Sequence, residues 1–133
     1  MKIREELVAE LVAEASRKMS DPNYSAVVVG GFVQQQTSTS HYFSAHEGEL
    51  GGPEAVVNVI FYAALLGECF KRTNNRTIPA MSFEDLNRVA EGDARAELER
   101  VQPAILSFLD ANVEQPAAKQ VLMLVALAME WVS

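Results

Sequence analysis

The chain has 133 residues, a formal net charge of −7 and nearly half of its residues apolar, which is the size and composition of one globular domain. The acidic balance argues against a general nucleic-acid binder, because such a protein needs Lys and Arg to displace counterions from phosphate. The single cysteine, Cys69, excludes an internal disulfide. Its apolar surroundings in "LLGECF" predict a buried, unreactive thiol.

Residues 2–19 form the first predicted element and the clearest one. Apolar residues such as Leu7 and Leu11 recur at helical spacing, and the charged residues are largely placed away from them. Pro22 ends the pattern, because a proline disfavours helical geometry at the residue before it. We expect an amphipathic helix with one buried face.

Residues 25–45 allow two interpretations. As strands, "AVVVGGFVQ" and "STSHYFSA" have the β-branched and aromatic content of a short hairpin near residues 26–44. As a helix, the segment places Val28 and Phe32 on one stripe, while Gly30 and Gly31 carry a propensity cost and would let a neighbouring backbone come close. Because every other element is predicted to be helical, we prefer the helix and keep the hairpin as the alternative.

The same segment contains an uncharged polar tract, "QQQTSTS", in an otherwise charge-rich sequence. A solvated face or loop is the plain interpretation. The sharper interpretation is a binding face, because amides and hydroxyls adapt to a polar ligand or partner without desolvating a charge. The candidate ligand or partner surface consists of Gln34, Gln35, Gln36, His41, His46, Glu47 and Glu49.

The run "HYFSAHEGEL" holds the only cluster of metal-ligating residue types. Histidine with a carboxylate can hold zinc or another divalent metal, which makes His41, His46 and Glu49 a candidate metal set. The histidines are five residues apart, however, and the known zinc helix motif places them four apart. On a helix the two rings would diverge, so chance surface residues are the rival interpretation.

Residues 53–72 are predicted to form a central helix. Pro53 suits the first helical position and Glu54 lies near the positive end of the helix dipole. The residues that follow leave almost no polar face, which is typical of a helix surrounded by others. The cations after it, Lys71, Arg72 and Arg76, are expected to complement the negative end of the dipole, with an anion site as the alternative.

Three further local signals divide the rest of the chain. Ser82 and Asp85 in "SFED" resemble a capping box, and Asp93 can cap the helix that follows. Pro103 should kink or divide that helix. A final helix begins near Pro116 and is apolar on most sides.

A domain of about five helices is expected to bury only one nearly all-apolar helix on every side, and this sequence contains two. The second one either completes the core or lies at a contact between subunits. A homo-oligomer is therefore one of the two outcomes that this apolar surplus predicts.

Taken together, the patterns predict a mainly α-helical single domain over residues 1–133, with about five helices. No nucleophile elbow or phosphate-binding glycine motif occurs, so we favour a non-enzymatic interaction or regulatory module that self-associates or binds a protein partner. The alternative is a metal- or small-ligand-binding protein, or an enzyme, that uses His41, His46, Glu47 and Glu49. We expect no cofactor and no nucleic-acid partner.

A cytoplasmic protein without a membrane partner is the remaining expectation. The start of the chain, "MKIREELVAELVAEA", is charged throughout and lacks the apolar stretch of a signal peptide. No uninterrupted apolar run in the sequence reaches the length of a membrane span. Lys119 is the only basic residue within the last helix, which is unlike an interfacial membrane helix.

Overall fold

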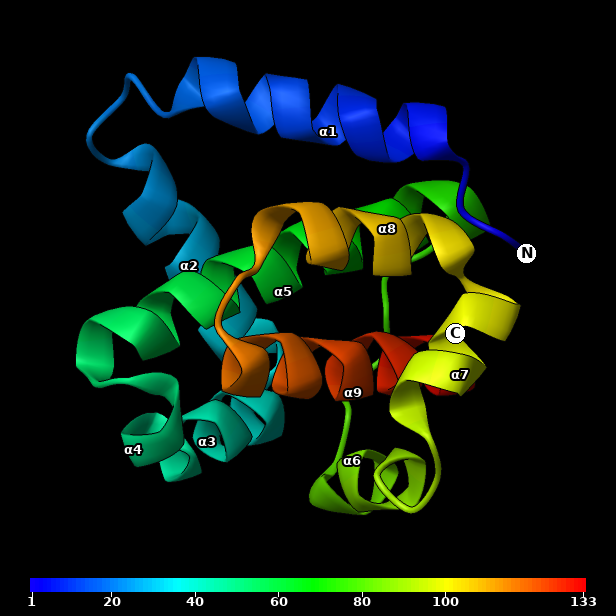
Figure 1. Cartoon of the computed structure of the whole chain (residues 1–133). Coiled ribbons are helices and arrows are strands. Elements are labelled where there is room, and N and C mark those ends of the chain that lie inside the picture. The colour runs from blue at the N-terminus through cyan, green and yellow to red at the C-terminus, as the bar shows by residue number, and fades with distance from the viewer.

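The computed structural model describes all 133 residues and consists of nine α-helices without a strand. Figure 1 shows α1, α8 and α9 lying one above another, with α5 crossing behind them and α2, α3 and α4 gathered at one end. The helices are α1 Glu5–Lys18, α2 Tyr24–Gln35, α3 Thr37–Ala45, α4 Glu47–Leu50, α5 Pro53–Asn74, α6 Phe83–Val89, α7 Ala94–Val101, α8 Pro103–Asn112 and α9 Pro116–Val132.

The mainly helical, compact fold predicted from the sequence is confirmed, but the expected number of about five helices is wrong. Short breaks divide segments that the periodicity treats as continuous. Pro103 separates α7 from α8, as predicted, because a proline ring cannot continue a helix that already occupies the preceding turn. Gln36 separates α2 from α3 with φ −126° and ψ 58°, and no proline or glycine in the sequence marks that break.

The alternative of a β-hairpin near residues 26–44 is also wrong. Residues 24–35 and 37–45 are helices that satisfy their backbone groups internally. A lone hairpin would leave both outer edges without partners and is marginal on its own. The helical form also brings Phe32 and Phe43 into the core, where their rings stack with centroids 6.5 Å apart.

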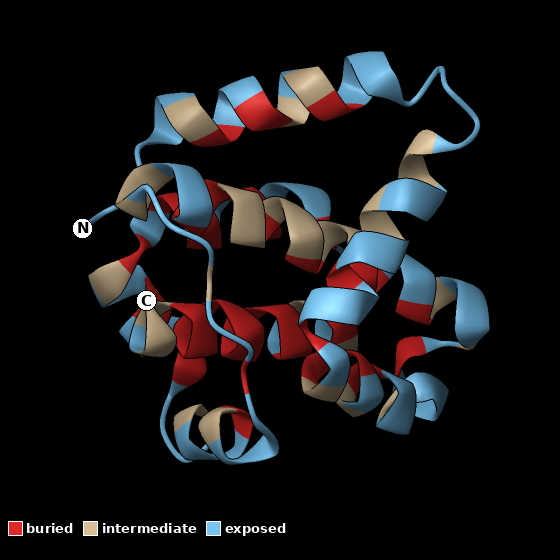
Figure 2. Cartoon of the chain, turned by 180° about the vertical axis from the view of Figure 1, so that it is seen from behind, coloured by how far each residue is buried: buried red, intermediate tan, exposed pale blue.

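The core is built around α5 and α9, which pack against each other. Ten residues of α9 are buried, and Figure 2 shows this helix as the most continuously buried element of the fold. α9 is enclosed by α5, α6, α7 and α8. The second apolar helix therefore completes the core, and the surplus that suggested a subunit contact does not lie on α9.

By length and composition alone, α5 could cross a membrane. It has 22 residues, and a window of 18 has a mean hydropathy of 1.4. The core helix of a globular protein passes the same test, so this finding is weak support for a membrane span. In the fold, α5 packs against α1, α2, α3, α4 and α9.

Several helix ends are set by the local signals predicted from the sequence. The Ser82 hydroxyl accepts a hydrogen bond from the Asp85 amide at 3.1 Å, and the Asp85 carboxylate accepts one from the Ser82 amide at 2.9 Å, which confirms the capping box. Asp93 caps α7 through the Ala96 amide at 3.1 Å. Gly51 adopts φ 109° at the end of α4, in the left-handed region that favours glycine.

A buried glutamine joins the two ends of the chain. Gln102 lies in the break between α7 and α8 and is fully buried. Its Oε1 accepts a hydrogen bond from the Ile3 amide at 2.8 Å. Its Nε2 donates to the Met1 carbonyl at 2.9 Å and to the Glu130 carboxylate at 2.8 Å. The start of the chain is thereby tied to α9, and every hydrogen-bonding group of this buried amide except one lone pair has a partner.

Candidate functional site

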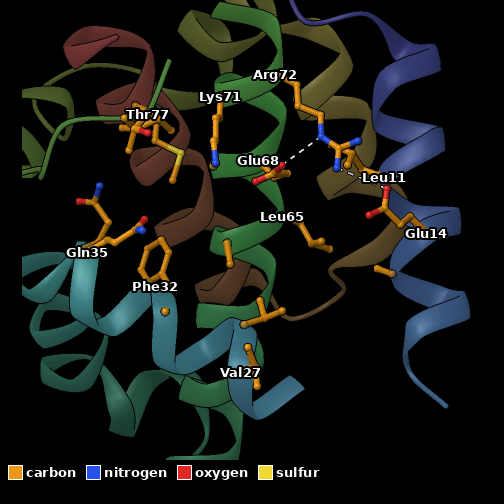
Figure 3. Close-up of a pocket in the computed structure, with 18 of the residues that line it drawn as sticks. Leu11, Glu14, Val27, Phe32, Gln35, Leu65, Glu68, Lys71, Arg72 and Thr77 are labelled. Atoms are coloured by element: carbon orange, nitrogen blue, oxygen red, sulfur yellow. Dashed lines mark hydrogen bonds and ion pairs between the residues drawn. The ribbon is translucent and has the colours of Figure 1, made fainter. Parts of the chain in front are cut away.

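A groove of about 410 Å³ opens between α1, α2 and α5, and Figure 3 shows the side chains that line it. It exists because α1 packs on α5 and α8, whereas α2 packs on α5 and α3. The two helices therefore diverge over the surface of α5, and the space between them stays open.

The floor of the groove is apolar. On each helix the lining residues follow helical spacing: Leu11 and Ala15 on α1, and Val28 and Phe32 on α2, are four residues apart. Leu65 of α5 lies between the two helices in Figure 3. The groove therefore offers an apolar surface between two helices, although none of its walls is apolar throughout.

Charged side chains occupy the rim on the side of α1 and α5. Glu14 pairs with Lys18 at 2.9 Å and with Arg72 at 3.4 Å, and Arg72 also pairs with Glu68 at 3.1 Å. The hydrogen bond from Lys18, followed by its charge, lowers the pKa of Glu14. The hydrogen bond to Glu68 is the main cause that raises the pKa of Arg72. Lys71 lines the same groove and has no carboxylate within ion-pairing distance.

One end of the groove is bounded by an aromatic contact between α1 and α2. The Lys18 ammonium lies 5.9 Å from the centre of the Tyr24 ring, within the range of a cation–π contact. Tyr24 in turn meets Phe61 of α5 edge to face, with centroids 6.0 Å apart. These contacts join the start of α2 to the end of α1 and to α5.

The three glutamines of the predicted surface differ in exposure and in hydrogen bonding. Gln35 is exposed and lines the groove, and Gln34 is exposed outside it. Gln36 is only 5% exposed. Its Nε2 donates to the Pro79 carbonyl at 3.0 Å, and its Oε1 accepts from the Met81 amide at 2.8 Å. Gln36 therefore holds the segment before α6 in place, and its amide is not free for a ligand.

The histidines and glutamates of the candidate metal set are not gathered into one site. His41 is exposed on α3, and Glu47 and Glu49 are exposed on α4. His46 is half-buried, with its Nδ1 2.8 Å from the Tyr42 carbonyl. No group of three or more His, Cys, Asp or Glu side chains is placed to hold a metal ion, so His41, His46 and Glu49 do not form a ligand set in this structure.

A second surface lies mainly on the opposite flank of α2 and shares Val27 with the groove. It consists of exposed residues that helical spacing brings to one side, and we name it the α2 outer face. These residues are Ala26, Val27, Gly30, Val33 and Gln34. α2 contains no charged residue, and Val27 is 70% exposed. A Cβ atom added at Gly30 would meet no other atom within 4 Å, so nothing in the chain requires a glycine there.

Cys69 offers no reactive group to the groove beside it. The thiol is buried, as predicted, and burial raises its pKa to about 12. It therefore remains protonated at neutral pH, and a thiol is a far weaker nucleophile than a thiolate.

Comparison of this chain with protein-family models, with curated proteins and with solved structures finds no match. The two surfaces that its own structure offers differ in shape and chemistry. The groove is concave and has charges on its rim, whereas the α2 outer face is convex and carries none. A concave groove is typical of a site for a small molecule, whereas an uncharged convex face is typical of the centre of a contact between proteins.

Most of the groove could not be found from the sequence. Leu11, Phe32 and Leu65 come from three separate helices and meet only because the helices pack as they do. Two signals were available in the sequence. Lys71 and Arg72, for which an anion site was the alternative interpretation, line the groove. α2 contains no charged residue, which is unusual for a helix at the surface.

Proposed function

We propose that this chain is a non-enzymatic interaction module that self-associates through the α2 outer face. One observation carries the proposal: a helix without any charged side chain leaves Val27 70% exposed. Exposed apolar surface of this kind is typical of an interaction site. Binding of a different protein at this face is the more general version of the same proposal. The alternative function at His41, His46, Glu47 and Glu49 gains no support from the positions of those residues.

The geometry of the face suits a second helix. Ala26, Gly30 and Val33 follow the spacing of one helix face. Gly30 has no side chain and no neighbour, so another backbone can approach closely at that point. In a two-fold dimer the same patch meets itself, which would place Gly30 opposite Gly30 of the second copy.

Electrostatics also favours this face for a contact between copies. Each chain carries a net charge of −7, so two copies repel each other over most of their surface. α2 lacks both acidic and basic residues, and contact there brings no charges of like sign together. Because salt screens the remaining repulsion, we expect self-association to strengthen as the ionic strength rises.

The association should be weak. A helix of 12 residues is about 18 Å long. One such helix against its copy buries less than the roughly 1,200 Å² of standard stable interfaces. We therefore expect a dimer that forms with rising protein concentration and dissociates on dilution.

Sedimentation velocity over a wide range of protein concentration tests the proposal. The parent chain should shift from monomer to dimer, and Val27→Asp should remain monomeric because it places charges at the contact. Val57→Asp is the matched control, since Val57 is also an exposed valine, at 45%, but lies on α5 outside the face. Thermal unfolding shows whether each variant is folded. A parent that stays monomeric at the highest concentration and ionic strength, or an equal loss in both variants, would refute the proposal.

A further inference from the structure

We infer that the groove between α1, α2 and α5 binds a small amphipathic anion, a molecule with an apolar tail and one carboxylate or similar anionic group. The inference rests on the composition of the groove and on Lys71, and it does not depend on self-association through the α2 outer face. The two surfaces share Val27 but otherwise lie on different flanks of α2.

The balance of charges in the groove favours an anion. Three cations and two carboxylates line it. The carboxylates of Glu14 and Glu68 are engaged by Lys18 and Arg72. Lys71 is left without an ion-pair partner, so the groove has an excess of positive charge in a chain whose net charge is −7. An incoming anion would meet one free cation, whereas an incoming cation would meet no free carboxylate.

Two further polar groups lie on the same side of the groove as Lys71. Figure 3 shows Lys71 between Arg72 and Thr77, with Gln35 below Thr77, while Arg72 extends toward α1. The side chains of Gln35 and Thr77 are exposed and make no hydrogen bond within the chain. An amide NH₂ and a hydroxyl can both donate to an oxyanion. The anionic group would therefore lie against Lys71, within reach of these two donors.

The apolar part of the groove accounts for the tail. Phe32 and Leu65 line it below the polar end in Figure 3. Val28 and Ile78 also line the groove and add partly buried apolar side chains. A volume of about 410 Å³ lies in the range of sites for small molecules. A molecule with a charged head and an apolar tail matches both ends of the groove, and a wholly apolar molecule would leave Lys71 without a counterion.

Adjacent glycines make the site testable. Gly31 lines the groove, and Gly30, one residue earlier, belongs to the α2 outer face. A Cβ atom added at either position would meet no other atom within 4 Å, and both lie in regular helix. Gly31→Leu should fill the groove without disturbing the core, and Gly30→Leu is its matched control on the other flank.

The experiment is a titration of the ¹⁵N-labelled full chain, followed by two-dimensional NMR, with three probes that share one tail: octanoate, octan-1-ol and octylammonium. Ionic strength is held constant. Octanoate should shift the amide signals of α2 and α5 around the groove in a saturable way. Octan-1-ol should bind at least about tenfold more weakly, because it lacks the charge that Lys71 attracts, and octylammonium should give no saturable shift at the groove.

The variants then locate the site. Gly31→Leu should abolish the octanoate shifts, and Lys71→Gln should weaken binding about tenfold. Gly30→Leu and Lys2→Gln, which changes a lysine outside the groove, should bind octanoate as the parent does. Thermal unfolding checks that each variant is folded, and Lys71→Gln keeps the test decisive if Gly31→Leu fails to fold.

Three outcomes would overturn the inference: no saturable shift with octanoate, equal binding of octanoate and octan-1-ol, or shifts scattered over exposed apolar residues outside the groove. The two proposals remain distinguishable because Gly30→Leu should impair sedimentation as a dimer and spare octanoate binding. Gly31→Leu should abolish octanoate binding and leave dimer formation unchanged.

Discussion

The segment α2–α3 and the segment α8–α9 both contain helices rich in apolar residues, but they differ in how far those residues are buried. In α8–α9, runs of consecutive apolar residues are buried. In α2–α3, Val27 is 70% exposed while Thr39, a polar residue, is fully buried. Figure 2 shows the contrast, with a long buried stretch in α9, which the burial of Val121 to Met129 accounts for, and with α2 largely exposed.

The contrast shows that the burial of a helix depends on its neighbours as much as on its composition. α9 lies among α4, α5, α6, α7 and α8, and the stretch from Val121 to Met129 is buried without a break. α2 packs mainly against α5 and α3, and it touches α1 only near its start, where Lys18 lies over the Tyr24 ring. Its remaining surface is left to solvent or to another molecule, which is why both proposals concern this helix.

The largest expected effect tests whether apolar residues of the two segments differ in their contribution to stability. Leu122 on α9 is fully buried, so Leu122→Ala should lower the free energy of unfolding by about 3 kcal/mol. Val27→Ala on α2 should change it by less than about 0.5 kcal/mol. Urea unfolding of both variants measures the difference, and similar losses would show that α2 is as well packed as α9.

The next effect concerns the glutamine that secures α8–α9 to the start of the chain. Gln102→Ala should lower the free energy of unfolding by about 2 kcal/mol, because it leaves the buried Ile3 amide without its hydrogen bond. Gln34→Ala, at an exposed position of α2, is the control and should be nearly neutral. Chemical unfolding gives both values. A neutral Gln102→Ala would mean that water replaces the lost partner.

Thr39 should respond in the opposite direction to most buried residues. Its Oγ1 is buried and has no hydrogen-bond partner, and burying a hydroxyl in this way costs about 1–3 kcal/mol. Thr39→Val keeps the shape and removes that group, so the free energy of unfolding should rise by about 1 kcal/mol. Thr37→Val is the control, because the exposed Thr37 hydroxyl already donates to the Val33 carbonyl at 3.1 Å; no gain is expected there. A loss of stability at Thr39 would point to a partner for its hydroxyl.

The glycines of α2 should sharpen the comparison further. Gly30→Ala and Gly31→Ala each add a methyl group that meets nothing within 4 Å. Each should raise the free energy of unfolding by about 0.5–1 kcal/mol through helix propensity alone. Gly51→Ala should be destabilising, since Gly51 has φ 109°. If Gly30→Ala stabilises the monomer and weakens the dimer, the glycine is retained for contact with a second copy.

The smallest effect is expected at the surface of α8–α9. Arg95 and Lys119 lower the pKa of Asp110 from its ordinary 3.8 to about 2. Because the folded pKa lies below the unfolded one, the ionised carboxylate stabilises the fold above pH 3.8, and this contribution is lost as the pH falls toward 2. Asp110→Asn removes the titrating group, so the melting temperature should fall less steeply over that pH interval. The difference should be small, because these ion pairs are exposed to solvent. Glu114→Gln, an exposed acid without an ion pair, should leave the curve unchanged.

The sequence predicted the well-marked helices and missed the breaks that carry no marker. The amphipathic pattern of residues 2–19, the start at Pro53, the capping box at Ser82 and the division at Pro103 all appear in the structure. These features depend on residues within about four positions of one another, which a sequence displays directly. Gln36 ends α2 because its amide binds the backbone around residue 80, and no local pattern reveals such a partner.

The candidate surfaces divide in the same way. The sequence by itself determined that residues 24–35 are apolar and uncharged, that Lys71 and Arg72 follow a long apolar helix, and that Cys69 is buried. The tertiary structure decided that α1 and α2 diverge over α5, that Gln36 is enclosed, and that Lys71 faces a groove without a counterion. Helix formation depends on contacts three and four residues apart. The groove depends on how three separate helices, α1, α2 and α5, pack together, which no short stretch of sequence encodes.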